Sequence, residues 1–379
     1  MSERKRPRIL VLAPNKPGTG LGGAERHLKD LADALLPLAE SVNFLSRADC
    51  PLPSGFERLL LRIEPMLASP LAVRRLMRRG IPDADVLITV ELMGVGIQHP
   101  RHIHLFFGSY SGFREMALPP VTGARNFVRM IKSRLARELE RRTQGRFGAI
   151  ATSDGVKQVL HARGIPALDT SIVPPTDCDR FTPGNKLESR KALSLPQNKR
   201  LLLFAGRWEY AKGADRCCRL LELLSKDWHL VVATPSEYTW PLPDPDRATF
   251  LTDLTTEQMI AAYRASDILI QPSRFEGYSL VASEAQACGC PVITSPVGHA
   301  VHFLNSADPD IRASVISQPD DPFSWSAAIQ GIVENDEKLD ALAKTHRKYA
   351  VEHVSLPQIR SEFSLALSNI FEEFSWQPR

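Results

Sequence analysis

Short apolar runs alternate with longer segments of helical periodicity over the first half of the chain. The runs are rich in Val, Ile, Leu and Phe and are bounded by Pro, Gly or Asp: Arg8–Ala13, Val42–Ser46, Val86–Val90, Ile103–Phe107, Ala149–Thr152 and Ser171–Val173. Such runs are typical of buried parallel strands. Between them, segments such as Ala24–Leu36 and Val121–Arg142 repeat apolar residues at helical spacing. The alternation predicts a parallel sheet covered by helices.

The same alternation starts again after a turn-rich stretch from Pro174 to Asn185. The second series of strand-like runs comprises Arg200–Ala205, His229–Ala233, Thr249–Leu251, Ile268–Gln271 and Pro291–Thr294. We therefore predict two Rossmann-like domains, residues 1–180 and 181–356, facing an interdomain cleft. The amphipathic segment within residues 357–379 follows the second sheet, and we expect its helix to pack back toward the first domain. Doubly wound sheets bind ligands at the carboxyl ends of their strands, so the expected site is the cleft.

Length and composition agree with a soluble two-domain protein. The chain has 379 residues, of which 43% are apolar, and its longest apolar stretches are strand-sized. A membrane-spanning helix would need about 20 apolar residues in a row. The basic and then apolar start is explained better by a first strand than by a signal peptide. The six cysteines show no metal-ligand spacing, and we expect reduced thiols and a cytoplasmic location.

Positive charge is concentrated in the first half of the chain. The first 180 residues carry a net charge of +9 and the remainder carries −5. Two clusters contain most of the excess: Arg74, Arg75, Arg78 and Arg79 in the first, and Arg125, Arg129, Lys132, Arg134, Arg137, Arg141, Arg142 and Arg146 in the second. These are either solvated helix faces or a surface for anionic headgroups or an anionic acceptor. Nucleic acid is not an expected partner, because no aromatic-rich recognition module accompanies the charge.

The second basic cluster overlies apolar residues at three- and four-residue steps, Phe127, Met130, Ile131, Leu135 and Leu139. This spacing fits either a helix packed on the core or an interfacial helix at the inner face of a membrane.

A glycine-rich loop follows the first predicted strand. Gly18, Gly20, Gly22 and Gly23 precede a helix that begins near Ala24. Glycines at a strand-to-helix turn let the backbone approach a phosphate, and the helix N-terminus adds N–H donors. The spacing also spells G-x-G-x-x-G, which favours an NAD(P)-dependent oxidoreductase. However, the strand does not run directly into the first glycine, and Arg47 and Asp49 after the second strand show no clear cofactor preference.

Two cations follow the first strand of the second predicted domain. Arg207 and Lys212 stand in the string LLLFAGRWEYAKG, just before a helix that begins near Gly213. A planar guanidinium and a mobile ammonium are suited to binding a diphosphate from two directions. The alternative is that Arg207 and Lys212 are solvated surface cations. Their position at the end of a strand where such sheets bind ligands argues against this alternative.

Two glutamates lie eight positions apart in the string ILIQPSRFEGYSLVASEAQACG. Glu276 is in a loop after a strand, and Glu284 is in a short helix that Gly289 ends. The N–H groups of the residues that open this helix could bind sugar or phosphate oxygens. A buried carboxylate needs partners, and sugar hydroxyls are natural donors to it. The alternative for Glu284 is an ordinary helix-surface residue.

These strings, with GGAERH and IVPPTDCDRFTP, resemble the retaining GT-B glycosyltransferases of family 4, whose hallmark is two glutamates separated by seven residues. The resemblance extends from Ile9 to about Val333. It implies that Gly22 and Gly23 line the donor diphosphate, that Arg207 and Lys212 neutralise it, and that Glu284 accepts the ribose hydroxyls. It also implies a donor-sugar subsite formed by Glu276, Gly277, Tyr278, Ser279 and Leu280, with Arg207, Lys212 and Glu276 in the catalytic role.

The resemblance implies transfer of a hexose-type sugar from a UDP- or GDP-sugar to a hydroxyl acceptor, with retained configuration and no obligatory metal. The first domain would bind the acceptor, through loops such as that spanning residues 108–122. Acceptor candidates are an envelope polysaccharide or lipid-linked glycan and a small natural product. A non-catalytic protein that binds sugar nucleotides is a further alternative, although the intact cations and glutamates argue against it.

The sequence departs from the family pattern at some positions. Where relatives carry a sugar-contacting histidine after the fourth strand, this chain has Phe107 or Gly108, and we expect His104 to be a core histidine. A Gly-Gly pair is replaced by Gly298–His299, and the usual glycine-rich turn after the second strand of the donor domain is absent. These changes imply an unusual preference for the donor sugar.

Overall fold

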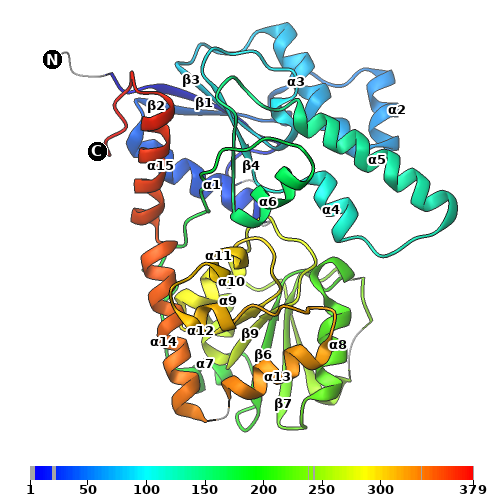
Figure 1. Cartoon of the computed structure of the whole chain (residues 1–379), viewed down its shortest axis with the longest axis vertical. Helices are drawn as coiled ribbons and strands as arrows, with labels where there is room; N and C mark the ends of the chain where they lie inside the picture. Colours follow the sequence, from blue (N-terminus) through cyan, green and yellow to red (C-terminus); the bar gives the residue numbers. More distant parts are fainter. Residues whose placement is uncertain (1–4, 19–22, 238, 242–243, 334, 379) are drawn as a thin grey trace. The chain divides into compact units, whose positions relative to one another are not determined.

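The computed structural model describes residues 5–18, 23–237, 239–241, 244–333 and 335–378. The chain divides into two compact units (Figure 1). The first comprises Met1–Glu115, Val121–Pro174 and Pro357–Arg379, and the second comprises Met116–Pro120 and Pro175–Leu356. Each unit contains one parallel sheet of five strands, as the two series of apolar runs predict.

The sheet of the first unit has the strand order β2-β1-β3-β4-β5. Its strands are β1 (Arg8–Leu12), β2 (Ser41–Leu45), β3 (Val86–Val90), β4 (His102–Phe106) and β5 (Ala149–Ala151). The helices of this unit are α1 (Gly23–Leu35), α2 (Gly55–Ile63), α3 (Ala68–Arg79), α4 (Tyr110–Met116), α5 (Gly123–Arg141), α6 (Asp154–Ala162) and α15 (Leu356–Ile370). The strand predicted over Ser171–Val173 is wrong, because Ser171 forms a single bridge to Ala151 and the pairing extends no further.

The sheet of the second unit has the strand order β10-β9-β6-β7-β8. Its strands are β6 (Arg200–Ala205), β7 (Trp228–Thr234), β8 (Ala248–Thr252), β9 (Ile268–Gln271) and β10 (Val292–Thr294). Its helices are α7 (Lys186–Ala192), α8 (Ala214–Leu223), α9 (Thr256–Ala265), α10 (Leu280–Ala287), α11 (Ala300–Leu304), α12 (Pro309–Ala313), α13 (Pro322–Ile332) and α14 (Asp336–His353).

The strands in the interior of each sheet are buried on both faces. Every residue of β3, β4, β7 and β9 is buried, as expected of parallel strands covered by helices on two sides. The strand order reverses between β6 and β9, since the chain builds β7 and β8 on one side and β9 and β10 on the other. A switch point of this kind opens a crevice at the carboxyl ends of the two strands. The loops that follow β6 and β9 therefore line this crevice.

The C-terminal segment Pro357–Arg379 belongs to the first unit. Phe371 is fully buried and packs its ring against Phe147, with centroids 4.9 Å apart. Arg360, on α15, donates a hydrogen bond to the carbonyl oxygen of Asp33. Glu373 forms an ion pair with Arg101, with 2.5 Å between oxygen and nitrogen. The last residues of the chain thus complete the core that the first residues begin.

In the part of the chain that the structure describes, no helix combines the length and apolar character needed to cross a bilayer. All six cysteines are free thiols.

Candidate donor site

The loop after β6 places Lys212 beside the end of β9. Lys212 ends a short 3₁₀ turn (Tyr210–Lys212), and Gly213 follows with a φ of +81°. A Cβ atom at Gly213 would lie 2.2 Å from the carbonyl oxygen of Pro272, which follows β9. Both the left-handed backbone and this close approach require glycine. The glycine therefore lets the two loops at the switch point touch.

Lys212 and Glu276 form an ion pair at this point. The Lys212 ammonium lies 2.7 Å from Oε1 and 2.8 Å from Oε2 of Glu276. Ser273 donates a second hydrogen bond to Oε1, at 2.7 Å. The side chains are 24% and 12% exposed, so a ligand can still reach them. Lys212 and Glu276, which the resemblance assigns to the diphosphate and to the sugar of the donor, are thus in direct contact.

Arg207 lies apart from this pair in the described structure. Its side chain is 57% exposed and pairs with Glu209, two residues along the same loop, at 3.0 Å. It makes no described contact with Lys212 or Glu276. The predicted grip of two cations on one diphosphate is therefore not preformed, and Arg207 would have to exchange Glu209 for the ligand.

The backbone between Glu276 and α10 is held in an unusual conformation. Ser279, the residue before α10, has a φ of +114°, and its side chain does not cap the helix. The next loop braces this segment: the N–H of His299 donates to the carbonyl oxygen of Tyr278, and Gly298 leaves no room for a Cβ beside Glu276. A left-handed serine is strained, and strain of this kind concentrates at functional sites. The amides predicted to bind the donor thus lie in a rigid, strained turn.

Glu284 lies within α10 and is buried. The Tyr263 hydroxyl donates a hydrogen bond to its Oε2 at 2.8 Å, and Tyr263 itself is fully buried. The prediction that Glu284 is not a solvated surface residue is confirmed. Any ribose hydroxyl bound there would have to share the carboxylate with this tyrosine.

Two arginines that the sequence interpretation missed hold the loops around Lys212 and Glu276. Arg274 forms paired hydrogen bonds with the carboxylate of Asp215, at 2.7 and 2.8 Å, and stacks over the ring of Tyr210. Burial alone would raise the pKa of Asp215, but hydrogen bonds and charge from Arg274 lower it below its usual value. Arg216 is buried and donates to the carbonyl oxygen of Pro272. Arg274 stands two residues before Glu276, and this proximity is the one signal the sequence offered.

His299, which stands where the resemblance noted in the sequence implies a glycine, is buried among aromatic rings. Its ring lies 4.8 Å from that of Tyr278 and 5.2 Å from that of Phe303. Burial, with a smaller contribution from neighbouring histidines, holds its pKa well below the ordinary value. The imidazole therefore stays neutral and packs beneath the strained turn.

Part of the glycine-rich loop of the first unit lies outside the described residues, including Gly20 and Gly22. Gly18 has a φ of +73°, and Gly23 is the first residue of α1. Asp49, considered for a dinucleotide ribose, pairs instead with Lys16 at 2.7 Å.

The histidine expected in the core lies there. His104 is fully buried in β4 and hydrogen-bonds the Thr89 hydroxyl at 2.7 Å. At the carboxyl end of β4, Phe107 stacks on the imidazole of His27 from α1, with ring centroids 3.7 Å apart. The sequence did not single out His27, because the contact joins residues 80 positions apart in the chain.

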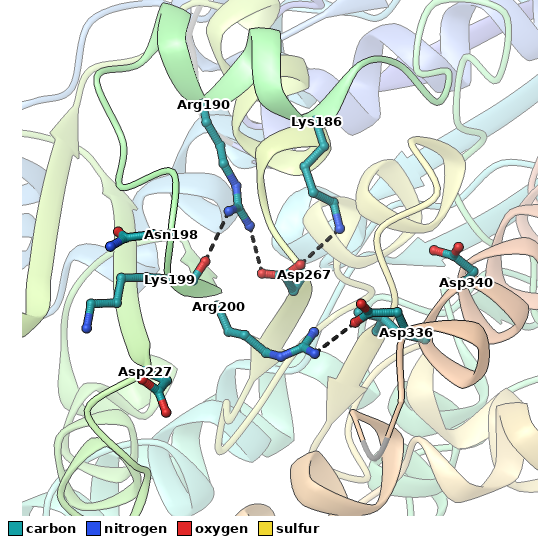
Figure 2. Close-up of a pocket in the computed structure, with 10 residues that line it drawn as sticks. Lys186, Arg190, Asn198, Lys199, Arg200, Asp227, Asp267, Asp336 and Asp340 are labelled. Atoms are coloured by element: carbon teal, nitrogen blue, oxygen red, sulfur yellow. Dashed lines mark hydrogen bonds and ion pairs between the residues drawn. The ribbon is translucent and has the colours of Figure 1, made fainter.

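A pocket of about 480 Å³ opens at the amino ends of the strands of the second sheet, opposite the carboxyl ends where Lys212 and Glu276 lie (Figure 2). Its lining includes Arg200 at the start of β6 and the residues just before β7 and β9, Asp227 and Asp267. Figure 2 shows Lys186 and Arg190 both pointing at Asp267, which they contact at 2.9 and 2.8 Å. These charges neutralise one another, and the pocket lies at the amino ends of the strands. We therefore interpret its lining as a structural network of ion pairs and not as the donor site. Among the described residues, no group of three or more His, Cys, Asp or Glu is placed to hold a metal ion.

Comparison with known sequences identifies relatives of the second unit. Residues 185–349 match the family model of glycosyl transferases group 1. A D-inositol 3-phosphate glycosyltransferase of Geodermatophilus obscurus is 34% identical over 218 residues, which are 52% of this chain and 47% of the relative. The enzyme of the same name from Thermobifida fusca is 28% identical over 84% of this chain and 82% of its own length. This chain spans about half the length of most of the curated relatives it matches.

Solved structures share the whole fold at low sequence identity. Sucrose-phosphate synthase from Thermosynechococcus elongatus superimposes with a TM-score of 0.71 and 18% identity, over 96% of this chain and 99% of that one. Anabaena Alr3699/HepE, solved with UDP-glucose, gives a TM-score of 0.65 at 15% identity, over 96% and 100% of the two chains. Residues 185–349 are thus similar to glycosyl transferases group 1, and the whole chain, with its two five-stranded parallel sheets, has the GT-B fold of these solved structures.

Proposed function

We propose that the protein transfers a hexose-type sugar from a nucleoside diphosphate sugar to a hydroxyl acceptor, with retention of the anomeric configuration. The observation that carries the proposal is the contact of Lys212 with Glu276 at the switch point of the second sheet, beside the strained turn that opens α10. A cation, a carboxylate and the backbone amides at the start of a helix are the groups needed to bind a phosphate next to a sugar. The solved UDP-glucose complex of Anabaena Alr3699/HepE supports the choice of donor.

In this proposal Lys212 and Arg207 stabilise the charge that grows on the departing diphosphate. The bond from the anomeric carbon to the phosphate oxygen breaks while the acceptor oxygen bonds to the same face of that carbon. The acceptor proton passes to the leaving phosphate oxygen. Each positioned charge or amide of this kind contributes about 10²–10³ in rate when water is excluded. Glu276 would bind sugar hydroxyls once the diphosphate competes for Lys212.

The acceptor is proposed at the level of chemical class. The names of the curated relatives favour a small phosphorylated polyol. The basic first unit favours a glycan or lipid-linked acceptor made at the inner face of a membrane, in which case the enzyme would work in the cytoplasm. We also propose that no metal is required, since Lys212 and Arg207 can provide the positive charge that the diphosphate needs.

A thermal-shift panel tests the proposal. UDP, GDP and ADP, each with and without EDTA, are compared with NADP. At least one diphosphate should raise the melting temperature, and EDTA should not reverse the shift. The variant Glu276→Gln should retain a diphosphate shift. Stabilisation by NADP with no response to any diphosphate would support the oxidoreductase alternative and overturn the proposal.

A further inference from the structure

Helix α5 carries an apolar stripe that faces away from the protein. Phe127, Ile131 and Leu135 follow one another at four-residue steps and are 59%, 48% and 38% exposed. Helical positions advance by about 100° per residue, so these three share one face. Of the buried residues of α5, Ser133, Ala136 and Glu140 lie away from this stripe, whereas Leu139, four residues after Leu135, continues the stripe and is buried. Of the two alternatives that the sequence left open, packing on the core holds for Leu139 but not for the exposed residues Phe127, Met130, Ile131 and Leu135.

Helix α2 presents a second stripe of the same kind. Phe56, Leu59 and Ile63 recur at three- and four-residue steps and are all exposed, and no residue of α2 is fully buried. The two helices meet through Lys132 of α5, which donates to the carbonyl oxygen of Ile63 at 3.1 Å and pairs with Glu64 at 3.0 Å. Figure 1 shows α2 and α5 at the same border of the first unit. We call these two exposed stripes the α2–α5 surface.

Exposed arginines flank the α2–α5 surface. Six of them are exposed and have no ion-pair partner among the described residues: Arg58, Arg62, Arg125, Arg134, Arg137 and Arg141. The acidic residues of the two helices are already engaged. Glu57 pairs with Arg75, Glu138 pairs with Arg142, and the buried Glu140 caps α4 by accepting from the N–H of Tyr110 and of Ser111. The surface therefore combines exposed apolar side chains with uncompensated positive charge.

We propose that the α2–α5 surface docks on an anionic lipid bilayer. Apolar side chains such as Phe127 enter the boundary between headgroups and acyl chains, and the arginines bind lipid phosphates. Helices with one apolar face bordered by cations bind membranes in this way, without spanning them. A protein partner would also cover apolar residues. However, the excess of arginines without an ion-pair partner among the described residues is complementary to the uniformly negative surface of an anionic bilayer. This docking does not depend on glycosyl transfer.

Co-sedimentation with lipid vesicles tests the docking. The full-length protein is mixed with vesicles of phosphatidylcholine, alone or with phosphatidylglycerol, at low and high salt. We expect binding to the anionic vesicles that weakens at high salt. Phe127→Ser/Ile131→Ser and Arg134→Gln/Arg137→Gln should each weaken binding about tenfold or more, because each surface cation and each inserted apolar side chain contributes separately.

Matched controls separate docking from general effects. Leu365→Ser removes an exposed apolar residue of α15, and Lys344→Gln/Lys348→Gln removes the same charge from α14; both should bind vesicles like the wild type. Equal binding by all variants, or none by the wild type, would overturn the proposal. So would a dimer, detected by light scattering, that dissociates in Phe127→Ser/Ile131→Ser. The diphosphate thermal shift should be unchanged in every variant, so a failure of docking is distinguishable from a failure of the proposed function.

Discussion

Lys212 and Glu276 form an ion pair with each other in the structure, so a sugar nucleotide bound as we propose would have to separate them. A diphosphate offers Lys212 more negative charge than one carboxylate does, and the released carboxylate can then accept hydrogen bonds from a sugar. Ser273 also donates a hydrogen bond to Glu276, which does not depend on Lys212. The ion pair and the Ser273 hydrogen bond thus hold both side chains in place.

We predict that Lys212→Ala lowers kcat by about 10²–10³, since the leaving diphosphate loses a positioned charge. Glu276→Gln should mainly impair turnover of the sugar and should affect UDP binding less. Steady-state kinetics and UDP titrations measure both effects. Lys226→Ala removes an exposed lysine of the same unit and should leave kcat unchanged. An equal loss in Lys226→Ala would mean that general electrostatics, rather than position, explains the effect.

Elements were easier to predict than contacts. Val86–Val90, Arg200–Ala205 and Ile268–Gln271 match their strands at both ends, because continuous apolar runs between breakers leave few alternatives. Ser171–Val173 failed because its pairing with β5 is a single bridge, between Ser171 and Ala151. The pairing of Lys212 with Glu276 spans 64 positions and depends on the strand order, which periodicity does not encode. Arg274 was missed for the same reason.

At the level of the loops, Gly213 should tolerate no side chain. Gly213→Ala places a Cβ against the carbonyl oxygen of Pro272 and forces a positive φ on alanine, so we expect a loss of about 1–3 kcal/mol in the free energy of unfolding. Urea denaturation measures it. Gly331→Ala, in α13 with open space around it, is the control and should be neutral or slightly stabilising. Equal stability of the two variants would show that the loop shifts freely.

Several histidines of the whole molecule are buried and neutral. Burial lowers the pKa of His346 to about 3, and burial together with the charge of His99 lowers the pKa of His102 to about 4. In the unfolded chain these groups take up protons near pH 6.5. The contribution of these neutral histidines to the free energy of unfolding is therefore fully present above about pH 6.5, and it is lost as the pH falls from about 6.5 toward 4. Each such histidine removes about 1.4 kcal/mol per pH unit within this window.

Urea midpoints measured across this pH range test the histidine effect. His346→Gln should make the pH dependence shallower by about one proton, whatever its stability at pH 7. The ring of His346 lies between Gln286 and Ser314 and hydrogen-bonds to both. A glutamine side chain at position 346 can make part of these hydrogen bonds in its place. His353→Gln, an exposed position on the same helix, should retain the wild-type slope. Identical slopes in both variants would contradict the assignment to His346.

The return of the C-terminal segment to the first unit sets an order of events during synthesis. Phe371 and Trp376 are translated after the second unit, yet both are buried in the first. The nascent amino-terminal half must wait with a gap in its interior while the intervening unit, contiguous apart from five residues, is free to mature. Chaperones that shield apolar surface would find their natural client in that waiting half.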